Sequence, residues 1–437
     1  MAKHSEKKGK RKIIQLKDHM PQQQAEPSRP EGETDPQEEE LPQAAIEYGE
    51  GEDGEEKGKK PFQTPKAVYR VAVVLLVAVL ALALWVNRDN LTPEKIWNWV
   101  QVQVMGDGTG DGYPLSITGS SVAERNFLCT DGNAVVLSDT ALTITGPSGQ
   151  ELLSLRHSFN QPVLESASGK YLLFNQNSTG YLVADSSGTK LDGSATQDIL
   201  AGAIAPNGRF ALATQGAEGA SEMTVYLATG EVQYTYNFAQ DYITALALNS
   251  DGTWAMACTV RSQGGELISK ITVFNLDDPT PAVEVEVRNN LLLDAYWGSN
   301  GVLYVLGDSS LFRARSSDLS FVEYSYGGRT PTAFQFAGGQ AYVSVSAYEH
   351  AGACTLLTFR NLDDPVEVQS EERITALSVY GGTVGALINR QLVLFDSTTG
   401  QELARVDAGS DAKSIALSSE SAAYVLGVSE VRRVQAS

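Results

Sequence analysis

Cysteine and histidine are scarce in this sequence, which has three Cys and four His among 437 residues. Three cysteines exclude a disulfide-rich scaffold, and without a Cys-x-x-Cys pair they give a metal site little support. Cys129, Cys258 and Cys354 have apolar neighbours, so we expect burial as small hydrophobic residues. Only His157 and His350 lie beyond the first twenty positions, far apart. Because no Gly-x-Ser-x-Gly, His-Glu-x-x-His or P-loop pattern occurs, we expect no catalytic residue, no cofactor and no enzyme.

Basic side chains are also few. The chain has 33 Lys and Arg against 53 Asp and Glu, which gives a formal net charge of −20. Residues 71–437 carry −18 of this charge, which argues against nucleic acid as a partner of this part. A cationic partner would be attracted to it instead. Because 42% of the residues are hydrophobic, a sizeable core is available and disorder of the whole chain is excluded.

Residues 1–66 differ from the rest in having almost no apolar clusters. A basic run, Lys7–Lys12, is followed by an acidic block from Glu31 to Glu56 that contains no Lys or Arg. Such a segment buries too little apolar surface to offset its chain entropy, so we predict a disordered tail. The basic run has two interpretations, either contact with anionic lipid or nucleic acid, or a solvated tail that sets topology, which we favour.

The longest hydrophobic run lies at residues 67–86, and no polar side chain occurs from 71 to 86. Its length approaches the ~20 residues that cross ~30 Å of hydrocarbon, so we predict one transmembrane helix. A snorkelling Arg and one aromatic residue near each end suit the two membrane interfaces. The predicted anchor residues at the ends of the span are Tyr69, Arg70, Val71, Trp85 and Val86.

Charged flanks predict the orientation of this helix. Lysines from Lys57 to Lys66 precede the span, whereas only Arg88 and Lys95 closely follow it. The positive-inside rule therefore places the N-terminus in the cytoplasm and the C-terminal part outside. Residues 81–83, Ala-Leu-Ala, resemble a signal-peptidase site. A 66-residue leader is too long for an ordinary signal peptide, so an uncleaved signal anchor is favoured over cleavage.

Residues 87–113 are predicted to be a juxtamembrane helix followed by a linker. Thr92 and Pro93 suit a helix start, and Trp97 and Trp99 then suit an interfacial or propeller-docking helix, although a plain linker helix fits as well.

The Gly/Asp-rich stretch at 106–112 is a weak candidate for a metal site. Asp107, Thr109 and Asp111 match positions 1, 3 and 5 of a calcium loop. Thr118 stands where the bidentate Glu belongs, and strand-like sequence follows instead of a helix. We therefore favour a flexible linker over a calcium site.

Residues 114–437 consist of short alternating apolar runs separated by turn pairs, which indicate an all-β domain. The segment Asn275–Pro279 recurs as Asn361–Pro365, 86 residues later. The spacing of candidate first strands averages about 41 residues, with four short strands per unit, which is typical of β-propeller blades. These candidate strands begin near Asn126, Val163, Ala201, Ile243, Leu291, Thr332, Ile374 and Lys413.

Three segments resemble known propeller repeats. Residues 205–213 and 249–257 are similar to the turn and following strand of WD-repeat and TolB-like blades, and 392–403 is similar to pyrroloquinoline-quinone-type repeats. No unit ends in Trp-Asp, and Leu403 stands in a region where the quinone-type repeat has its docking tryptophan. The resemblance implies a propeller and does not carry the quinone chemistry with it.

Ring closure is predicted from the two ends of this region. Residues 413–434 supply three strands, and Pro114–Thr118 is a single strand without a unit of its own. Pairing them would complete a blade and remove free sheet edges. We expect eight blades, with seven as the alternative if one unit is degenerate.

The overall plan resembles uncharacterised membrane-anchored propeller proteins of Gram-positive bacteria, whose function is unknown. We expect a single-pass membrane protein whose extracytoplasmic propeller, residues 114–437, acts as a binding or scaffold module for a protein, peptide or cell-envelope ligand. The alternative is a propeller enzyme, namely a quinone-type oxidoreductase, hydrolase or lyase. That alternative requires ionisable side chains to converge in the channel mouth.

Overall fold

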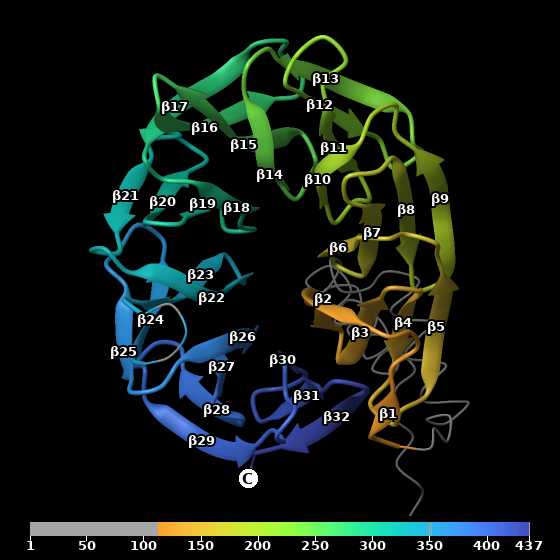
Figure 1. The fold of residues 1–437 in the computed structure, drawn as a ribbon, viewed down its shortest axis with the longest axis vertical. Coiled ribbons are helices and arrows are strands. Elements are labelled where there is room, and N and C mark those ends of the chain that lie inside the picture. Colours follow the sequence, from red (N-terminus) through yellow and green to blue (C-terminus); the bar gives the residue numbers. More distant parts are fainter. Residues whose placement is uncertain (1–111, 349, 351, 437) are drawn as a thin grey trace, which may run out of the picture. The chain divides into compact units, whose positions relative to one another are not determined.

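The computed structural model describes residues 112–436 apart from 349 and 351. These residues form eight antiparallel sheets of four strands each, arranged around a common axis (Figure 1). The fold is therefore an all-β, eight-bladed propeller, as predicted, and the seven-bladed alternative is wrong. Each observed first strand begins within four residues of its predicted start.

The first four blades follow one another along the chain, each with its first strand nearest the axis (Figure 1). Blade 1 has β2 (Val122–Thr130), β3 (Asn133–Ser138), β4 (Ala141–Thr145) and β5 (Glu151–Arg156). Blade 2 has β6 (Pro162–Ala167), β7 (Lys170–Asn175), β8 (Gly180–Asp185) and β9 (Gly188–Ser194). Blade 3 has β10 (Ile199–Ile204), β11 (Phe210–Gln215), β12 (Ser221–Tyr226) and β13 (Val232–Phe238). Blade 4 has β14 (Tyr242–Leu248), β15 (Trp254–Gln263), β16 (Glu266–Asn275) and β17 (Pro281–Arg288).

Blades 5 to 8 continue the ring. Blade 5 has β18 (Leu292–Trp297), β19 (Val302–Gly307), β20 (Ser310–Arg315) and β21 (Val322–Ser325). Blade 6 has β22 (Thr330–Ala337), β23 (Gln340–Ser346), β24 (Cys354–Arg360) and β25 (Val366–Ser370). Blade 7 has β26 (Ile374–Tyr380), β27 (Thr383–Ile388), β28 (Gln391–Asp396) and β29 (Glu402–Asp407). Blade 8 has β30 (Ser414–Leu417), β31 (Ala422–Leu426), β32 (Glu430–Gln435) and, as its fourth strand, β1 (Leu115–Ser116).

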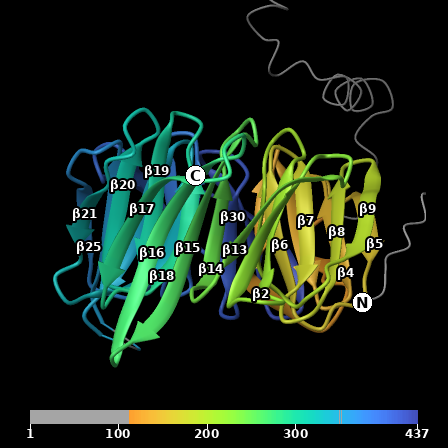
Figure 2. The ribbon, with the colours of Figure 1, turned by 90° about the horizontal axis from the view of Figure 1, so that it is seen from above.

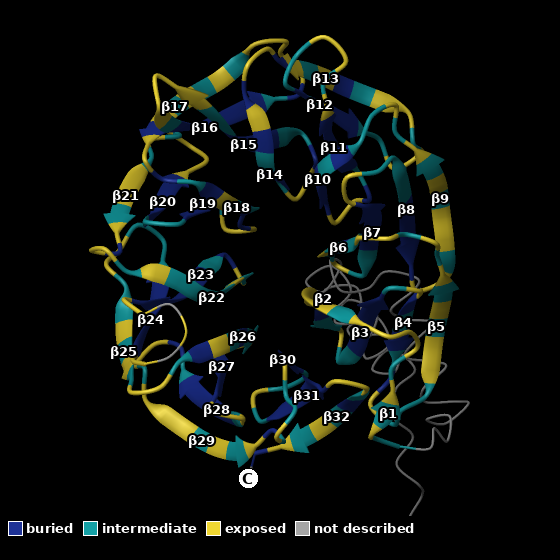
Figure 3. Cartoon of the chain, viewed as in Figure 1, coloured by how far each residue is buried: buried dark blue, intermediate teal, exposed yellow. Residues whose placement is uncertain are grey.

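Burial differs systematically between the strands of a blade (Figure 3). The second strands β19 and β27 are buried at every position, because both of their faces pack against neighbouring blades. The fourth strands β17 and β29 instead alternate between more and less exposed residues, because only one of their faces packs inward. This difference explains why apolar runs in the sequence mark the middle of each blade better than its rim.

The core is divided into eight apolar clusters, one at each junction between neighbouring blades. The cluster that joins blades 8 and 1 brings Phe127 and Val136 against Tyr424, Leu426 and Val431. Since every cluster spans two blades, removal of one blade would expose apolar surface on both of its neighbours.

Closure of the ring combines the two ends of the described chain in one sheet. Leu115 pairs with Val431 and Ser116 with Glu430, so β1 completes blade 8 as predicted. Behind this pairing, the buried Tyr424 hydroxyl donates a hydrogen bond of 2.7 Å to the Gly132 carbonyl oxygen in blade 1. Contacts between residues about 300 positions apart therefore hold the first and last blades together.

Several predictions concern residues outside the described part of the chain. They are the disordered tail at 1–66, the transmembrane helix at 67–86, the juxtamembrane Trp97 and Trp99, and the calcium candidates Asp107, Thr109 and Asp111. Within the described part of the chain, the structure contains no helix long and apolar enough to cross a bilayer.

We predict that Tyr424→Phe lowers the stability of the ring at its closure. The change keeps the buried ring but leaves the Gly132 carbonyl oxygen without its donor, which should cost about 1 kcal/mol. The urea midpoint of unfolding, followed by tryptophan fluorescence, should fall accordingly. Tyr380→Phe, at an exposed tyrosine, is the control and should leave the midpoint unchanged. Equal midpoints for the wild type and both variants would contradict this role of Tyr424.

Candidate functional site

The connections between strands lie on two faces of the ring, which Figure 2 shows edge-on. On the loop face, the second strand of each blade connects to the third, and the fourth strand connects to the next blade. The opposite turn face carries the connections from first to second and from third to fourth strands. The two faces therefore gather different sets of side chains.

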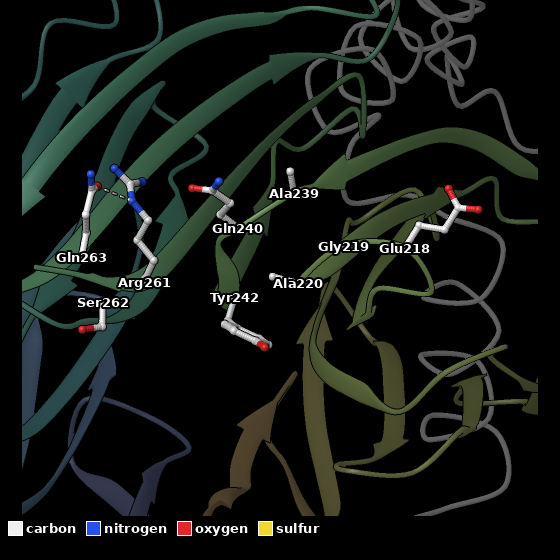
Figure 4. Close-up of a pocket in the computed structure, with 9 residues that line it drawn as sticks. All are labelled: Glu218, Gly219, Ala220, Ala239, Gln240, Tyr242, Arg261, Ser262 and Gln263. Carbon is white, nitrogen blue, oxygen red and sulfur yellow. Dashed lines mark hydrogen bonds between the residues drawn. The ribbon is translucent and has the colours of Figure 1, made fainter.

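A groove of about 610 Å³ lies on the loop face between blades 3 and 4 (Figure 4). It is formed by the β11–β12 connection, the β13–β14 connection with the first residue of β14, and the last three residues of β15. Tyr242 supplies an aromatic ring that is 55% exposed. The remaining lining residues are small, polar or charged, namely Glu218, Gly219, Ala220, Ala239, Gln240, Arg261, Ser262 and Gln263.

Close backbone packing shapes one side of this groove. A Cβ atom at Gly219 would lie 2.7 Å from the Phe238 carbonyl oxygen, a contact too short for any side chain. Ala220 donates its backbone N–H to the same carbonyl oxygen at 3.0 Å. The glycine therefore lets the β11–β12 connection pack directly against the end of β13.

A second hollow of about 310 Å³ lies where the loop face meets the axis. It adjoins the groove, because Tyr242 lines the groove and the next two residues, Ile243 and Thr244, line this axial hollow. Apolar side chains predominate in its lining. Besides those two residues, the lining consists of Gln176, Asn177, Leu200, Leu291, Leu292 and Leu293.

β-Bulges in the first strands form much of the axial hollow. The pairing of first with second strands shifts between Ile199 and Ala201 in blade 3. Equivalent shifts follow Ile243 in blade 4 and Leu292 in blade 5. A bulge inserts one unpaired residue and redirects its side chain. The inserted residues of these three blades, Leu200, Thr244 and Leu293, all line the axial hollow.

The Ile-Thr-Ala sequence shared by residues 243–245 and 374–376 marks this bulge. Thr244 donates its hydroxyl to the Cys258 carbonyl oxygen at 3.2 Å, and Thr375 does the same to that of Leu387, also at 3.2 Å. Each hydroxyl thus binds a carbonyl opposite the disrupted pairing. The structure therefore assigns this repeated sequence to a β-bulge, which periodicity alone does not show.

Ion pairs beside the groove leave an acidic excess. Arg261 contacts Asp241 at 2.8 Å and Glu286 at 3.2 Å, so its charge is already compensated. Lys270 lies 3.5 Å from Asp241 and 3.4 Å from Glu284. Most of these side chains are partly exposed, so each pair contributes little to stability. Their combined effect is to fix the Arg261 guanidinium and keep it from acting as a free cation.

One ion pair crosses the axis of the ring. Arg125 of blade 1 contacts Asp294 of blade 5 at 2.7 Å, although the two residues lie 169 positions apart and their blades are opposite in the ring. The Arg125 guanidinium also lies 5.2 Å from the ring centroid of Phe334 in blade 6, within the range of a cation–π interaction. We call Arg125, Asp294, Phe334 and the neighbouring Glu165 the axial cluster.

Glu165 of blade 2 is the most perturbed carboxyl group of this cluster. Burial raises the pKa of Glu165 to about 7, the positive charge of Arg125 opposes this shift, and the negative charge of Asp294 adds to it. A carboxyl group with a pKa in this range is half protonated near neutral pH. Protonation of Glu165 near neutral pH would therefore change the charge of the axial cluster.

The structure places the three cysteines in three different blades and keeps the two histidines apart. Cys258 and Cys354 are buried, as predicted, whereas Cys129 is only half-buried, because it lies near the turn-face end of β2. His157 accepts a hydrogen bond from the Phe159 N–H at Nδ1 and lies 3.1 Å through Nε2 from the Ser138 carbonyl oxygen. His350 lies in blade 6, so the two histidines do not form one site.

The paired aspartates also have structural positions. Asp278 accepts hydrogen bonds from the Thr280 N–H at 2.9 Å and the Thr280 hydroxyl at 2.7 Å, so it stabilises a local turn. In the second copy, the Asp363 carbonyl oxygen accepts a hydrogen bond from the buried Arg313 of blade 5. Among the described residues, no group of three His, Cys, Asp or Glu side chains is arranged to hold a metal ion.

Comparison with known proteins supports the fold. Residues 112–318 match the model of a family described as a family of unknown function, DUF5711. This match covers β1, blades 1 to 4 and the first three strands of blade 5. Because the family's function is unknown, the match adds no activity. No curated protein matches the sequence.

Two solved structures are among those similar to this chain. The crystal structure of Saccharomyces cerevisiae Sqt1 aligns with a TM-score of 0.54 and 13% identity, over 75% of this chain and 99% of Sqt1. The β-propeller domain of Myceliophteria thermophila Cps50 (Swd1) aligns with a TM-score of 0.48 and 12% identity, over 74% of this chain and 100% of that domain. At this identity the likeness to Sqt1 shows the fold alone.

We predict that Glu165→Gln changes how stability depends on pH. The pKa of Glu165 is raised from 4.5 in the unfolded chain to about 7, so the folded state binds the extra proton. This contribution is complete below pH 4.5 and is lost as the pH rises through 7. The variant should therefore gain about 2 to 3 kcal/mol relative to wild type between pH 5 and 8.

Urea midpoints measured across this pH range test the prediction. Glu231→Gln, which removes an exposed carboxylate from a turn-face connection, corrects for the general effect of one lost charge. A constant difference between Glu165→Gln and wild type across the range would show that Glu165 does not titrate near neutral pH.

Proposed function

We propose that the propeller is a binding module that holds a polypeptide partner on its loop face. The observation that carries this proposal is that two hollows, the groove between blades 3 and 4 and the axial hollow, lie on the loop face and are lined by consecutive residues of β14. Tyr242 in the groove and Leu293 in the axial hollow are exposed apolar side chains, and polar residues line both hollows beside them. Apolar anchors within a polar rim are the usual composition of a protein-binding surface.

The chemistry of the groove and the axial hollow favours binding over catalysis. The ionisable residues in their linings are Glu218, Tyr242 and Arg261, and Arg261 forms ion pairs with Asp241 and Glu286. The lining therefore has no nucleophile with an adjacent general base. The rigid ring instead offers a preformed surface, which reduces the entropy lost on association.

The enzyme hypothesis depends on the axial cluster. Glu165 has the pKa of a general acid or base, but Asp294 is held by Arg125 and neither carboxylate lines either hollow. We infer that the cluster supports the ring across its axis. If the cluster has this supporting role, Glu165→Gln should leave partner binding unchanged.

We further propose that the protein is anchored by one helix at residues 67–86, with the propeller outside the cytoplasm. The support is the uninterrupted apolar run and the excess of lysines before it. The acidic excess of the propeller suits a partner with basic groups or a cation-rich part of the cell envelope.

We predict that a photo-crosslinker at position 242 captures a protein partner in intact cells. Tyr242→Cys is labelled with a membrane-impermeant, thiol-directed photo-crosslinker, and Val322→Cys, on the exposed rim of blade 5, is the matched control. Burial raises the pKa of the native Cys129 to about 11, so it remains a protonated and slowly reacting thiol. Position 242 should give a discrete adduct that position 322 does not give.

The outcomes of this crosslinking experiment test the loop-face binding site and the location of the propeller separately. Labelling only after cell lysis would contradict the extracytoplasmic location. Labelling in intact cells with the same adducts, or none, at both positions would contradict a binding site on the loop face.

A further inference from the structure

Blade 4 projects beyond the ring on the loop face. Its β15 and β16 each have 10 residues, whereas β14 has 7, so their hairpin continues past the start of β14. The hairpin ends in Gly264 and Gly265, both with positive φ, and a Cβ atom at either would meet no atom within 4 Å. The tip of the hairpin therefore stands in open space beside the groove.

One edge of this projecting hairpin has no strand beside it among the described residues. β14 pairs with β15 only as far as the Tyr242–Val260 pair, which leaves Arg261–Gln263 uncovered on that side. These three residues are the β15 residues that line the groove. An uncovered strand edge presents backbone N–H and C=O groups to whatever occupies the space beside it.

The register identifies which backbone groups face the groove. Gln263 pairs with Glu266 across a two-residue turn, so this pair exchanges its backbone hydrogen bonds. Since hydrogen-bonded and non-hydrogen-bonded pairs alternate, Ser262 directs its N–H and C=O away from β16 and toward the groove. Val260, two residues earlier, has the same orientation and meets β14.

The charges around the groove indicate the composition of an occupant. Arg261, Lys270 and Arg288 are paired with Asp241, Glu266, Glu284 and Glu286. Glu218 lies on the β11–β12 side of the groove and has no ion pair among the described residues. Five carboxylates thus surround three cations, and a basic side chain suits this excess better than an acidic one.

We propose that an extended, basic segment of the partner binds in this groove by strand addition along Arg261–Gln263, an inference that rests on the proposed function. Its backbone exchanges hydrogen bonds with Ser262, one of its apolar side chains packs on the exposed Tyr242 ring, and a Lys or Arg approaches Glu218. Backbone bonds then supply affinity while side chains supply specificity, as in other β-augmentation complexes. The short edge limits self-association, because it offers few backbone groups to a second copy.

Two variants of Ser262 test strand addition. Ser262→Pro removes the outward N–H, and because that N–H is not used inside the hairpin, proline is tolerated there as on other strand edges. Ser262→Ala removes only the hydroxyl and is the matched control. The probe is a phage-displayed library of random heptapeptides, selected against the full-length protein in detergent micelles.

The proposal predicts enrichment of peptides that contain Lys or Arg. Their affinity should fall at least tenfold for Ser262→Pro, stay within twofold for Ser262→Ala, and fall when the basic residue is replaced by Glu. Peptides that bind Ser262→Pro as well as wild type, enrichment of acidic peptides, or no enrichment would each overturn it. An adduct at position 242 that persists in Ser262→Pro would leave the loop-face binding site in place and reject only the strand mode.

Discussion

The pairing of β1 with β32 is the contact on which the rest of this structure depends. It is only two residue pairs long, but it converts a row of seven complete blades and one incomplete blade into a closed ring. Closure removes two free sheet edges and completes the eighth apolar cluster. Tyr424, which reaches Gly132 of blade 1, adds a buried hydrogen bond to this junction. Without closure, blades 8 and 1 would each present an apolar face to water.

Closure also determines what the centre of the ring and its loop face can do. Arg125 and Asp294 meet because eight blades place blades 1 and 5 opposite each other, and a ring of different size would separate them. Bulges at corresponding positions then direct Leu200, Thr244 and Leu293 into one axial hollow. The longer hairpin of blade 4 breaks this regularity, and the groove lies beside it. The irregular blade 4 therefore gives the loop face a distinctive surface beside it.

Much of this architecture could be predicted from the sequence, because each blade repeats the same pattern of apolar runs and turns. The recurrence of Asn275–Pro279 at Asn361–Pro365, the even spacing of the first strands and the lone strand near residue 115 were sufficient for the period and the closure. The site was not predictable in the same way. Glu218, Tyr242 and Ser262 belong to three different connections or strand ends, and nothing local marks them as neighbours. Arg125 likewise has no distinguishing sequence context, because its contact with Asp294 exists only in the closed ring. A site formed by residues of different blades therefore has no recognisable motif in the sequence of any one blade.

Ring closure is tested most directly by a disulfide across its last junction. In the double variant Leu115→Cys/Val431→Cys, the two cysteines occupy directly paired positions of β1 and β32, where paired Cα atoms are about 4.5–5.5 Å apart. Gln391→Cys/Asp407→Cys, paired within blade 7, serves as the reference. A closed ring predicts that both pairs oxidise and that the closure disulfide raises the unfolding midpoint more, because it closes a far longer loop. Oxidation of the reference pair while residues 115 and 431 remain reduced would contradict a ring closed at this junction.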